Sequence, residues 1–439
     1  MSKHNRTFTA IFFVIFLAGL FVISFSSESD AATGRVIRKR VPSNGQRSTA
    51  SKTPPIFASG AGTQKSPYLI STAAQLAAFS NSVSGGNSYA GKYIRLGTDI
   101  DLEGAPWFPI GFSDRGRSNP FKGIFDGGGY IIWNLRGERP LMGLFGVIDG
   151  ATVNRINLQH VDLSGGSVGG IAAFMRNSVA TDCSVSGSVK GTSSVGGLVG
   201  SLLGGGLQNC DFLGQVEGRN AVGGLAGTID QARIRVGVIS GRVIGALDVG
   251  GAVGSILAGD IVACYGKNLL VKGEHNVGGL IGNIIESGGA DKSTFDGQVT
   301  GIGNIGGVAG RIGGGELHGC GTLGFVQGRA HIGGIVGELA GGGVVVSCTA
   351  DAAVVGVINV GGVVGEMTFG AVDHSNNKGT VRGGEAVGGV IGHLSNGSFV
   401  DSRNFGGVNG AYKVGMIVGA EGDSTFVPDP GRGGIIGNR

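Results

Sequence analysis

The chain has 439 residues, of which 92 are glycine and 41% are hydrophobic, and its formal net charge is +4. The glycines follow no strict three-residue period and the apolar content is high, which excludes a collagen-like triple helix and a flexible glycine-rich tail. The basic residues are scattered rather than gathered in a stripe, so the sequence argues against a nucleic-acid partner.

The first 31 residues have the pattern of a secretory signal peptide. Lys3 and Arg6 precede an apolar run from Ala10 to Phe25, and small residues around Ala31 mark a cleavage site. An uncleaved membrane anchor is the alternative, although the apolar run is shorter than the ~20 residues that span a bilayer. We therefore expect a mature protein that begins near Ala32, has no membrane span, and is secreted or displayed at the cell surface, with the periplasm as a further compartment.

Two segments precede the main part of the chain. Residues 32–55 combine basic residues with Ser, Thr and Pro and have no apolar period, which predicts a disordered linker. Residues 56–139 contain both tryptophans, Trp107 and Trp133, and are predicted to form an N-terminal capping module.

Within this module the sequence predicts one short helix. Thr72-Ala-Ala-Gln75 is a capping-box pattern, in which the Thr and Gln side chains satisfy backbone N–H groups of the first turn. Leu76, Phe79 and Val83 follow at helical spacing, so a helix should begin at Ala73. Apolar runs at 93–96 and 130–133 are predicted to be strands.

Residues 140–419 form a repeat array. A Gly-apolar-apolar-Gly tetrapeptide recurs there with a period of about 27–28 residues, which is within the range of known repeat architectures. Its last residue falls at eleven positions: Gly146, Ala173, Gly200, Gly227, Gly254, Gly282, Gly310, Gly337, Gly365, Gly392 and Gly419. Each unit contains three short β-type runs, the first being Val195–Gly200 in one unit, which excludes helical repeats.

Such units cannot bury their apolar side chains alone. Stacked about 4.8 Å apart, each supplies backbone hydrogen-bond partners to the next. The sequence therefore predicts an all-β fold, a right-handed parallel β-helix of about eleven coils, with residues 420–439 as a C-terminal tail or cap. Glycine pairs such as Gly250-Gly251 and Gly278-Gly279 are expected at coil corners, where a positive φ or a close backbone approach excludes a Cβ.

The five cysteines share one position in the repeat, predicted to lie four residues before the end of the second run. They are Cys183, Cys210, Cys264, Cys320 and Cys348, and the equivalent positions elsewhere hold Gly237, Ser293, Ser375 and Ser402. A column of small interior side chains accounts for them, and an odd count argues against a complete disulfide framework. Inter-coil disulfides, such as one between Cys183 and Cys210 or between Cys320 and Cys348, are the alternative.

The repeats resemble a known motif. Val195-Gly-Gly-Leu-Val-Gly200 and Val277-Gly-Gly-Leu-Ile-Gly282 resemble the GLUG motif, named for its Gly-Leu-any-Gly core. Trp107-Phe-Pro-Ile-Gly111 and its surroundings are similar to the region that often precedes such arrays. The resemblance implies a bacterial, secreted or surface-displayed, adhesin-like β-solenoid. Some similar proteins are attached to a metallopeptidase, but this chain has no His-Glu-x-x-His run, so that activity is not carried over.

Motifs that carry catalytic chemistry are absent from the sequence. The seven histidines lie at no metal-ligand spacing from one another or from cysteine pairs, and neither a Gly-x-Ser-x-Gly elbow nor a phosphate-binding loop occurs. The sequence therefore predicts no catalytic residue, no metal site and no cofactor, and it leaves the ligand-binding residues unknown.

Two features could still bind a ligand. The residue after each Gly-apolar-apolar-Gly is polar in eight successive coils: Ser201, Thr228, Ser255, Asn283, Arg311, Glu338, Glu366 and His393. We expect a polar outer face here, although Glu338 and Glu366 could share a proton or hold a cation. Trp107, Phe108 and Trp133 could stack on a sugar, but a plug at the end of the stack is the favoured interpretation.

The leading functional hypothesis is a non-enzymatic extracellular or cell-surface scaffold, adhesin-like, with a surface polysaccharide or a host or cell-surface protein as partner. The alternative is a carbohydrate-active β-helix enzyme, a polysaccharide lyase or hydrolase, which rests on fold analogy alone. The near-constant repeat length leaves no room for the inserted loops that would form the walls of a catalytic cleft.

Overall fold

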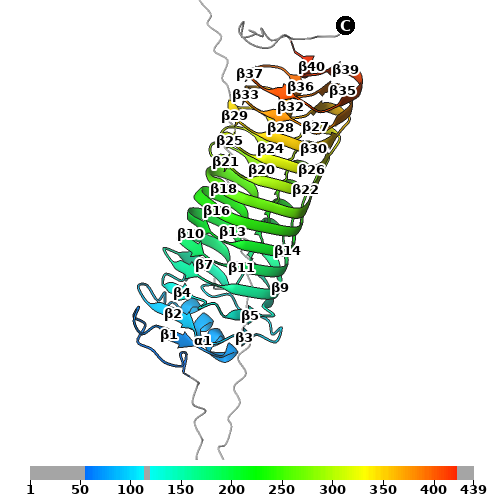
Figure 1. Cartoon of the computed structure of the whole chain (residues 1–439). Helices are drawn as coiled ribbons and strands as arrows, with labels where there is room; N and C mark the ends of the chain where they lie inside the picture. The colour runs from blue at the N-terminus through cyan, green and yellow to red at the C-terminus, as the bar shows by residue number, and fades with distance from the viewer. Residues whose placement is uncertain (1–54, 113–118, 423–439) are drawn as a thin grey trace, which may run out of the picture. The chain divides into compact units, whose positions relative to one another are not determined.

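The computed structural model describes residues 55–112 and 119–422 (Figure 1). The predicted signal peptide, nearly all of the predicted linker, and residues 423–439 of the predicted tail lie outside the described residues. The described residues form successive turns of parallel strands, from β1 to β40, with one helix, α1 (Ala73–Ser84), at the N-terminal end. No helix in these described ranges is both long and apolar enough to cross a bilayer. The predicted parallel β-helix is confirmed.

Each turn contains four strand segments rather than the three predicted. One full turn consists of β23 (Gly303–Gly306), β24 (Ala309–Ile312), β25 (Glu316–His318) and β26 (Gly321–Gln327). The predicted run Val195–Gly200 is divided between two strands, because the chain turns a corner at Gly197-Leu198. Strands of the same kind stack from turn to turn and make four columns.

We call the strands that follow the glycine pair the anchor column. All eleven predicted tetrapeptides lie at its start, so the predicted register is confirmed. Its strands are β7 (Phe145–Asp149), β10 (Ala172–Thr181), β13 (Val199–Gln208), β16 (Ala226–Ile244), β18 (Val253–Lys272), β20 (Ile281–Ile284), β24, β28 (Val336–Leu339), β32 (Val364–Met367), β36 (Ile391–Leu394) and β40 (Val418–Glu421).

The next column is longer, with 13 strands, because three strands upstream of the repeats pair into it in parallel. The array and residues 68–126 therefore share one continuous hydrogen-bonded sheet. The column contains β1 (Tyr68–Ile70), β2 (Tyr93–Leu96), β4 (Ile124–Asp126), β8 (Thr152–Asn154), the second halves of β10 and β13, parts of β16 and β18, β21 (Gly289–Asp291), β25, β29 (Gly343–Val346), β33 (Gly370–Asp373) and β37 (Ser398–Val400).

The third column holds the longest regular runs of each turn. It contains β3 (Ile100–Asp101), β5 (Ile131–Trp133), β9 (Asn157–Gly169), β11 (Ser184–Gly191), β14 (Asp211–Glu217), parts of β16 and β18, β22 (Thr294–Thr300), β26, β30 (Thr349–Val355), β34 (Asn376–Asn377), the start of β35 (Val381–Gly388), β38 (Arg403–Asn404) and the start of β39 (Val408–Gly415).

We call the fourth column the corner column, because each of its repeat strands ends at the first glycine of the pair. It contains β6 (Arg136–Met142), the end of β9, β12 (Ser193–Gly196), β15 (Asn220–Gly223), β17 (Leu247–Gly250), β19 (His275–Gly278), β23, β27 (Ala330–Gly333), β31 (Ile358–Gly361) and the ends of β35 and β39.

The helix closes the N-terminal end, as its sequence predicts. The Thr72 hydroxyl accepts from the backbone N–H of Gln75, and the Gln75 side chain accepts from the N–H of Ser71, which satisfies two donors at the helix start. Phe79 on its buried face packs against Phe121 and Phe125, with ring centroids 5.8 and 6.1 Å away. Helix α1 thereby covers apolar side chains at the N-terminal end of the stack.

Close backbone approach, not positive φ, explains the glycine pairs. Neither Gly251 nor Gly279 has a positive φ. A Cβ on Gly251 would lie 2.0 Å from the carbonyl oxygen of Gly279 in the next turn, and a Cβ on Gly279 would lie 2.1 Å from that of Gly307. The sequence offered positive φ or close backbone approach as the reason for these glycines, and close approach is the correct one. The stacking of the turns therefore requires the column of glycines.

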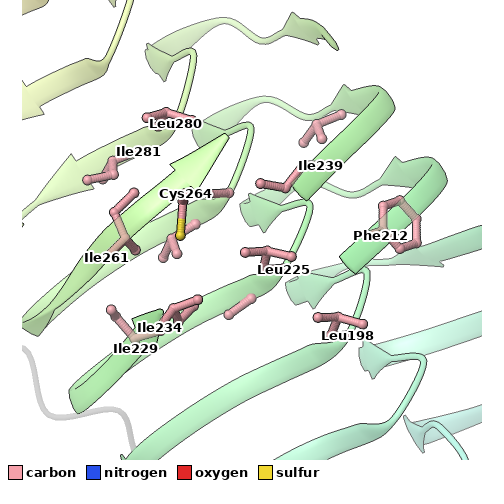
Figure 2. Packing of buried hydrophobic residues seen from close by; sticks show 14 of the residues in the cluster. Leu198, Phe212, Leu225, Ile229, Ile234, Ile239, Ile261, Cys264, Leu280 and Ile281 are labelled. Carbon is pink, nitrogen blue, oxygen red and sulfur yellow. The ribbon is translucent and has the colours of Figure 1, made fainter. Parts of the chain in front are cut away.

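The interior is a single apolar column in which side chains of successive turns stack. Figure 2 shows Leu198 and Leu225 at equivalent places in neighbouring turns, with Phe212 and Ile239 on the facing strand, and all four are buried. Towards the C-terminal end the interior also contains polar side chains, among them Ser375, Asn377 and Ser402. There the fully buried Asn377 donates to the Asn404 amide oxygen over 2.8 Å.

The cysteine column is confirmed as interior. All five thiols are buried and free, so the disulfide alternative is not realised. The Cys264 backbone N–H donates to Ser293, and that of Cys348 to Ser375, which confirms the predicted equivalents. One detail of the spacing is wrong. Leu269 takes the place that Gly241 and Gly297 hold in the neighbouring turns. Cys264 lies five residues before it rather than four, because the strand register shifts between Lys267 and Leu269.

We expect the cysteines to resist alkylation until the protein unfolds. Burial removes all five sulfur atoms from solvent, so a reagent cannot reach them, and at Cys264 burial also raises the pKa to about 12, so that this thiol seldom forms the reactive thiolate. Iodoacetamide at pH 8 should modify no cysteine of the native protein and all five after denaturation, as intact mass would show. Rapid modification of Cys183 or Cys264 in the native state would contradict the interior placement.

Candidate functional site

The anchor column carries the polar residues that the sequence singled out. Arg311 pairs in register with Glu338, Glu338 with Glu366, and Glu366 with His393, so the predicted column is confirmed. The expected polar outer face is only partly open to solvent. The side chains of Glu338, Glu366 and His393 are only 17–26% exposed, because a second row of polar side chains lies beside them.

The second row comes from the corner column and was not recognised in the sequence. In each turn from Ser194 to Ala386, the residue two positions before the glycine pair has a positive φ, for example Asn276 (53°), Asn304 (57°) and His331 (57°). Asn, Asp and His adopt this left-handed conformation more readily than most residues. Their recurrence in five successive turns, at Asp248, Asn276, Asn304, His331 and Asn359, was the available signal.

The two rows together form what we call the polar ladder. It consists of Asp248, Asn276, Asn304 and His331 from the corner column and Arg311, Glu338, Glu366 and His393 from the anchor column. Amide and carboxylate groups run along the corner row from turn to turn: Asn276 donates to Asp248 over 2.8 Å, and Asn304 donates to Asn276 over 2.9 Å.

The anchor row is tied to the corner row by charge-assisted contacts. Glu338 accepts from the Asn304 amide at 2.8 Å and from the Arg311 guanidinium at 3.2 Å. Glu366 lies between two histidines, with its carboxylate oxygens 2.9 Å from His331 Nδ1 and 3.5 Å from His393 Nδ1. Each glutamate therefore has its own partners, Asn304 and Arg311 for Glu338 and the two histidines for Glu366.

The pKa values follow from these contacts. The hydrogen bond from His331 lowers the pKa of Glu366, and the hydrogen bond to Glu366 raises the pKa of His331. At the other end of the ladder, burial raises the pKa of Asp248. The ladder thus holds its charges by internal pairing, and hydrogen bonds between turns fix the side chains that carry them.

Hollows on the surface of the described residues lie elsewhere. One follows the third column and is lined by residues such as Asn157, Ser184 and Asp211, and another is lined by Arg233, Arg235 and His318. Within the second, Arg233 pairs with Asp260 at 2.9 Å. Both are open and run along the columns, which suits an extended ligand better than an enclosed substrate.

The aromatic residues are not an open sugar platform. Trp107 is buried, and its indole N–H donates to the backbone carbonyl of Leu144 over 3.0 Å. Phe108 is covered by the Arg139 guanidinium, 5.6 Å from the ring centroid. Trp133 is half-buried, and its indole N–H donates to Gln159. These residues help to close the N-terminal end, as the favoured interpretation held.

The ion pair between His331 and Glu366 should make stability depend on pH. The raised pKa of His331 gives stability that is present below its unfolded value of about 6.5 and is lost as the pH rises through the folded value. The lowered pKa of Glu366 gives stability that is present above about 4.5 and is lost as the pH falls through the folded value. The pair is therefore fully effective between about pH 4.5 and 6.5.

We expect His331→Gln to lower the melting temperature at pH 5.5 and to change it far less at pH 9, where the imidazole is neutral. His275→Gln provides the control, because His275 occupies the same column but is exposed. Thermal unfolding at the two pH values measures both variants. An equal loss at pH 5.5 and pH 9 would show that packing, not charge, accounts for the contribution of His331.

Comparison with known proteins gives partial matches. No family model matches the chain, so the GLUG resemblance stays a prediction. The chain is 33% identical over 148 residues to halomucin of Haloquadratum walsbyi, and 38% identical over 102 residues to a "putative Gly-rich membrane protein" of Evansella cellulosilytica. These matches cover 30% and 21% of this chain, and only 2% and 11% of the two relatives.

One solved structure covers most of the chain. It is described as a "putative immunoglobulin A1 protease" from Bacteroides ovatus, and the alignment covers 85% of this chain and 83% of that one. The sequence identity is 20% and the TM-score is 0.30. At that TM-score the likeness bears on neither the fold nor the activity of this chain.

Proposed function

We propose that this protein is a non-enzymatic extracellular or cell-surface scaffold whose long strand columns present a binding surface. The uniform length of the turns carries this proposal most directly. The spacing of successive anchors varies by no more than a single residue throughout the array, so side chains repeat in register over eleven anchor strands without an inserted loop. A surface of this kind offers many equivalent contacts to a long partner.

The electrostatics of the polar ladder support the same proposal. A general acid and base need pKa values poised for proton transfer and a pocket that shields the substrate from water. The carboxylates of Glu338 and Glu366 are instead paired with cations, and the lowered pKa of Glu366 keeps it ionised. The polar ladder therefore serves to hold neighbouring turns together.

The open hollows are where we place the partner. The hollow around Arg233 and Arg235 presents exposed guanidinium groups, of which Arg233 is paired with Asp260. Extended, acidic surface polysaccharides fit an open hollow with such donors, since arginine binds carboxylates through paired N–H groups. The partial likeness to a protein named for a membrane is consistent with a place in the cell envelope.

A panel of acidic and neutral polysaccharides tests the proposal. We expect the mature protein to bind at least one acidic member saturably and to leave its chain length unchanged. Arg233→Glu with Arg235→Glu should weaken that binding, whereas the control Lys190→Glu, a charge change on the third column, should not. Binding to none of the panel would contradict a polysaccharide partner, and shortening of any bound polymer would contradict a non-enzymatic role.

A further inference from the structure

The hollow around Arg233 and Arg235 carries as many negative as positive side chains. Three cationic and three anionic residues line it: Arg233, Arg235, Lys292, Asp260, Asp291 and Glu316. Counting His318 as neutral, these charges cancel. A hollow that selected for negative charge alone would have an excess of cationic groups. The balance of charge therefore indicates a ligand that carries both signs.

Most of these charges are satisfied by one another. The Arg233 guanidinium lies 2.9 Å from a carboxylate oxygen of Asp260. The Asp291 carboxylate lies between two partners, with His318 Nδ1 at 3.0 Å and Lys292 Nζ at 3.8 Å. A ligand that bound one of these groups would have to replace the contact that it broke, so it would gain little net affinity there.

Two opposite charges in the hollow have no such partner. Arg235 and Glu316 are both exposed, and neither forms an ion pair with any residue in the described ranges 55–112 and 119–422. They lie three turns apart in the register of the second column, which pairs Arg235 with Val262, Val262 with Asp291, and Asp291 with His318, two residues after Glu316. At the spacing of stacked strands this is about 14 Å along the stack. A ligand that meets both charges must therefore be an extended chain.

We propose that the partner of this hollow is a zwitterionic polysaccharide, a polymer with both carboxylates and free amines, lying along the stack. A carboxylate of the polymer meets the Arg235 guanidinium, which offers paired N–H donors, and an ammonium group meets the Glu316 carboxylate. This inference rests on the proposed function and narrows its partner from acidic polysaccharides in general. Among the described residues that line the hollow there is no Phe, Tyr or Trp, so charge rather than ring stacking selects the polymer.

A polypeptide also carries both charges, but the hollow does not suit one. Extended peptides are commonly bound by adding a strand to an exposed sheet edge. The strands that line this hollow already have neighbours on both sides: β21 pairs with β18 and β25, and β25 pairs with β21 and β29. Their backbone groups are bonded to adjacent turns, so only side chains are left for a ligand.

Three forms of one polymer test the proposal. Native hyaluronan carries carboxylates only, partial N-deacetylation adds free amines, and methyl esterification of the deacetylated form leaves the amines only. We expect the mature protein to bind the deacetylated form about fivefold more tightly than either of the others, the effect of one exposed charge pair. Isothermal titration calorimetry at pH 6, with fragments of equal length, measures the three affinities.

Single substitutions assign the two contacts. Glu316→Gln should remove the preference for the deacetylated form over native hyaluronan. Arg235→Gln should weaken binding of both carboxylate-bearing forms by about fivefold and leave that of the ester unchanged. Glu274→Gln and Arg242→Gln are the matched controls, because both residues are exposed and lie outside the lining of the hollow, and they should change none of these affinities.

Equal affinity of the unaltered protein for native and deacetylated hyaluronan, or binding of neither while another acidic polysaccharide binds, would overturn the zwitterionic ligand and leave the proposed function standing. A preference for amines that Glu316→Gln leaves intact would place amine recognition outside this hollow and overturn the site. Tighter binding of an alternating Glu-Lys polypeptide than of deacetylated hyaluronan would assign the hollow to a protein partner. Binding of no polysaccharide at all would overturn the proposed function, and the zwitterionic ligand with it.

Discussion

Replacing Gly251 or Gly279 with valine is expected to lower the free energy of unfolding by about 3 kcal/mol, the upper end of the range for overpacking. A Cβ at Gly251 would lie 2.0 Å from the Gly279 carbonyl oxygen and 2.6 Å from Leu269, and real Cβ atoms do not approach backbone so closely. Two turns would have to move apart, which would break hydrogen bonds along the corner. Chemical denaturation followed by circular dichroism measures the loss.

The matched control for this experiment is Gly321→Val. Gly321 lies within strand β26 and has no positive φ, and the nearest atoms to its Cβ would be 3.7 Å away, at ordinary contact distance. The same substitution there should change stability by less than about 1 kcal/mol. If Gly251→Val and Gly321→Val have equal effects, the close approach between turns is not what the glycine pairs provide.

Replacing Phe295 with alanine is expected to cost about 3–5 kcal/mol, the usual range for a fully buried phenylalanine. Its ring fills space that small neighbours leave. In the register of the third column it lies between Gly266 and Thr322, and a Cβ on Gly279 would come within 2.4 Å of its ring. Glycine and threonine cannot expand into the cavity, so the site has little means of collapsing.

Phe369→Ala is the control for Phe295→Ala, because Phe369 is 55% exposed and should tolerate truncation within about 0.5 kcal/mol. The comparison uses the same denaturation measurement. A small loss for Phe295→Ala would mean that neighbouring turns close over the vacated volume, which would contradict a rigidly stacked interior.

The sequence predicted the anchor register well for a physical reason. At the glycine pairs a backbone carbonyl of the next turn meets a residue without a Cβ, so the spacing of the pairs along the sequence gives the number of residues in each turn. It did not reveal the corner within Val195–Gly200, because this corner needs no positive φ and the run reads as one strand. The sequence also did not reveal the extra residue near Asn268. A local register shift there makes the interval between two anchors only one residue longer than the 27 residues of the preceding turns.

The polar ladder was predicted in part. Glu338, Glu366 and His393 follow the anchor at a fixed offset, so their alignment could be read from the repeat. Their partners His331 and Asn304 belong to the corner column, and the distance between two columns depends on the corner geometry, which spacing alone does not give. The partners therefore came only from the structure, and with them the half-buried state of both glutamates.

The measurement that tests the account most directly is polymer cleavage by the unaltered protein and by the triple variant Glu338→Gln, Glu366→Gln, His393→Gln. Glutamine keeps the size and much of the hydrogen bonding of glutamate, so the variant should fold and lose only about 1–2 kcal/mol of stability. Reducing ends and chain lengths are followed for a panel of polysaccharides. We expect neither protein to release new ends while both bind the same polymers. Any polysaccharide that the unaltered protein cleaves and the triple variant does not would contradict both the structural role of the polar ladder and the non-enzymatic function.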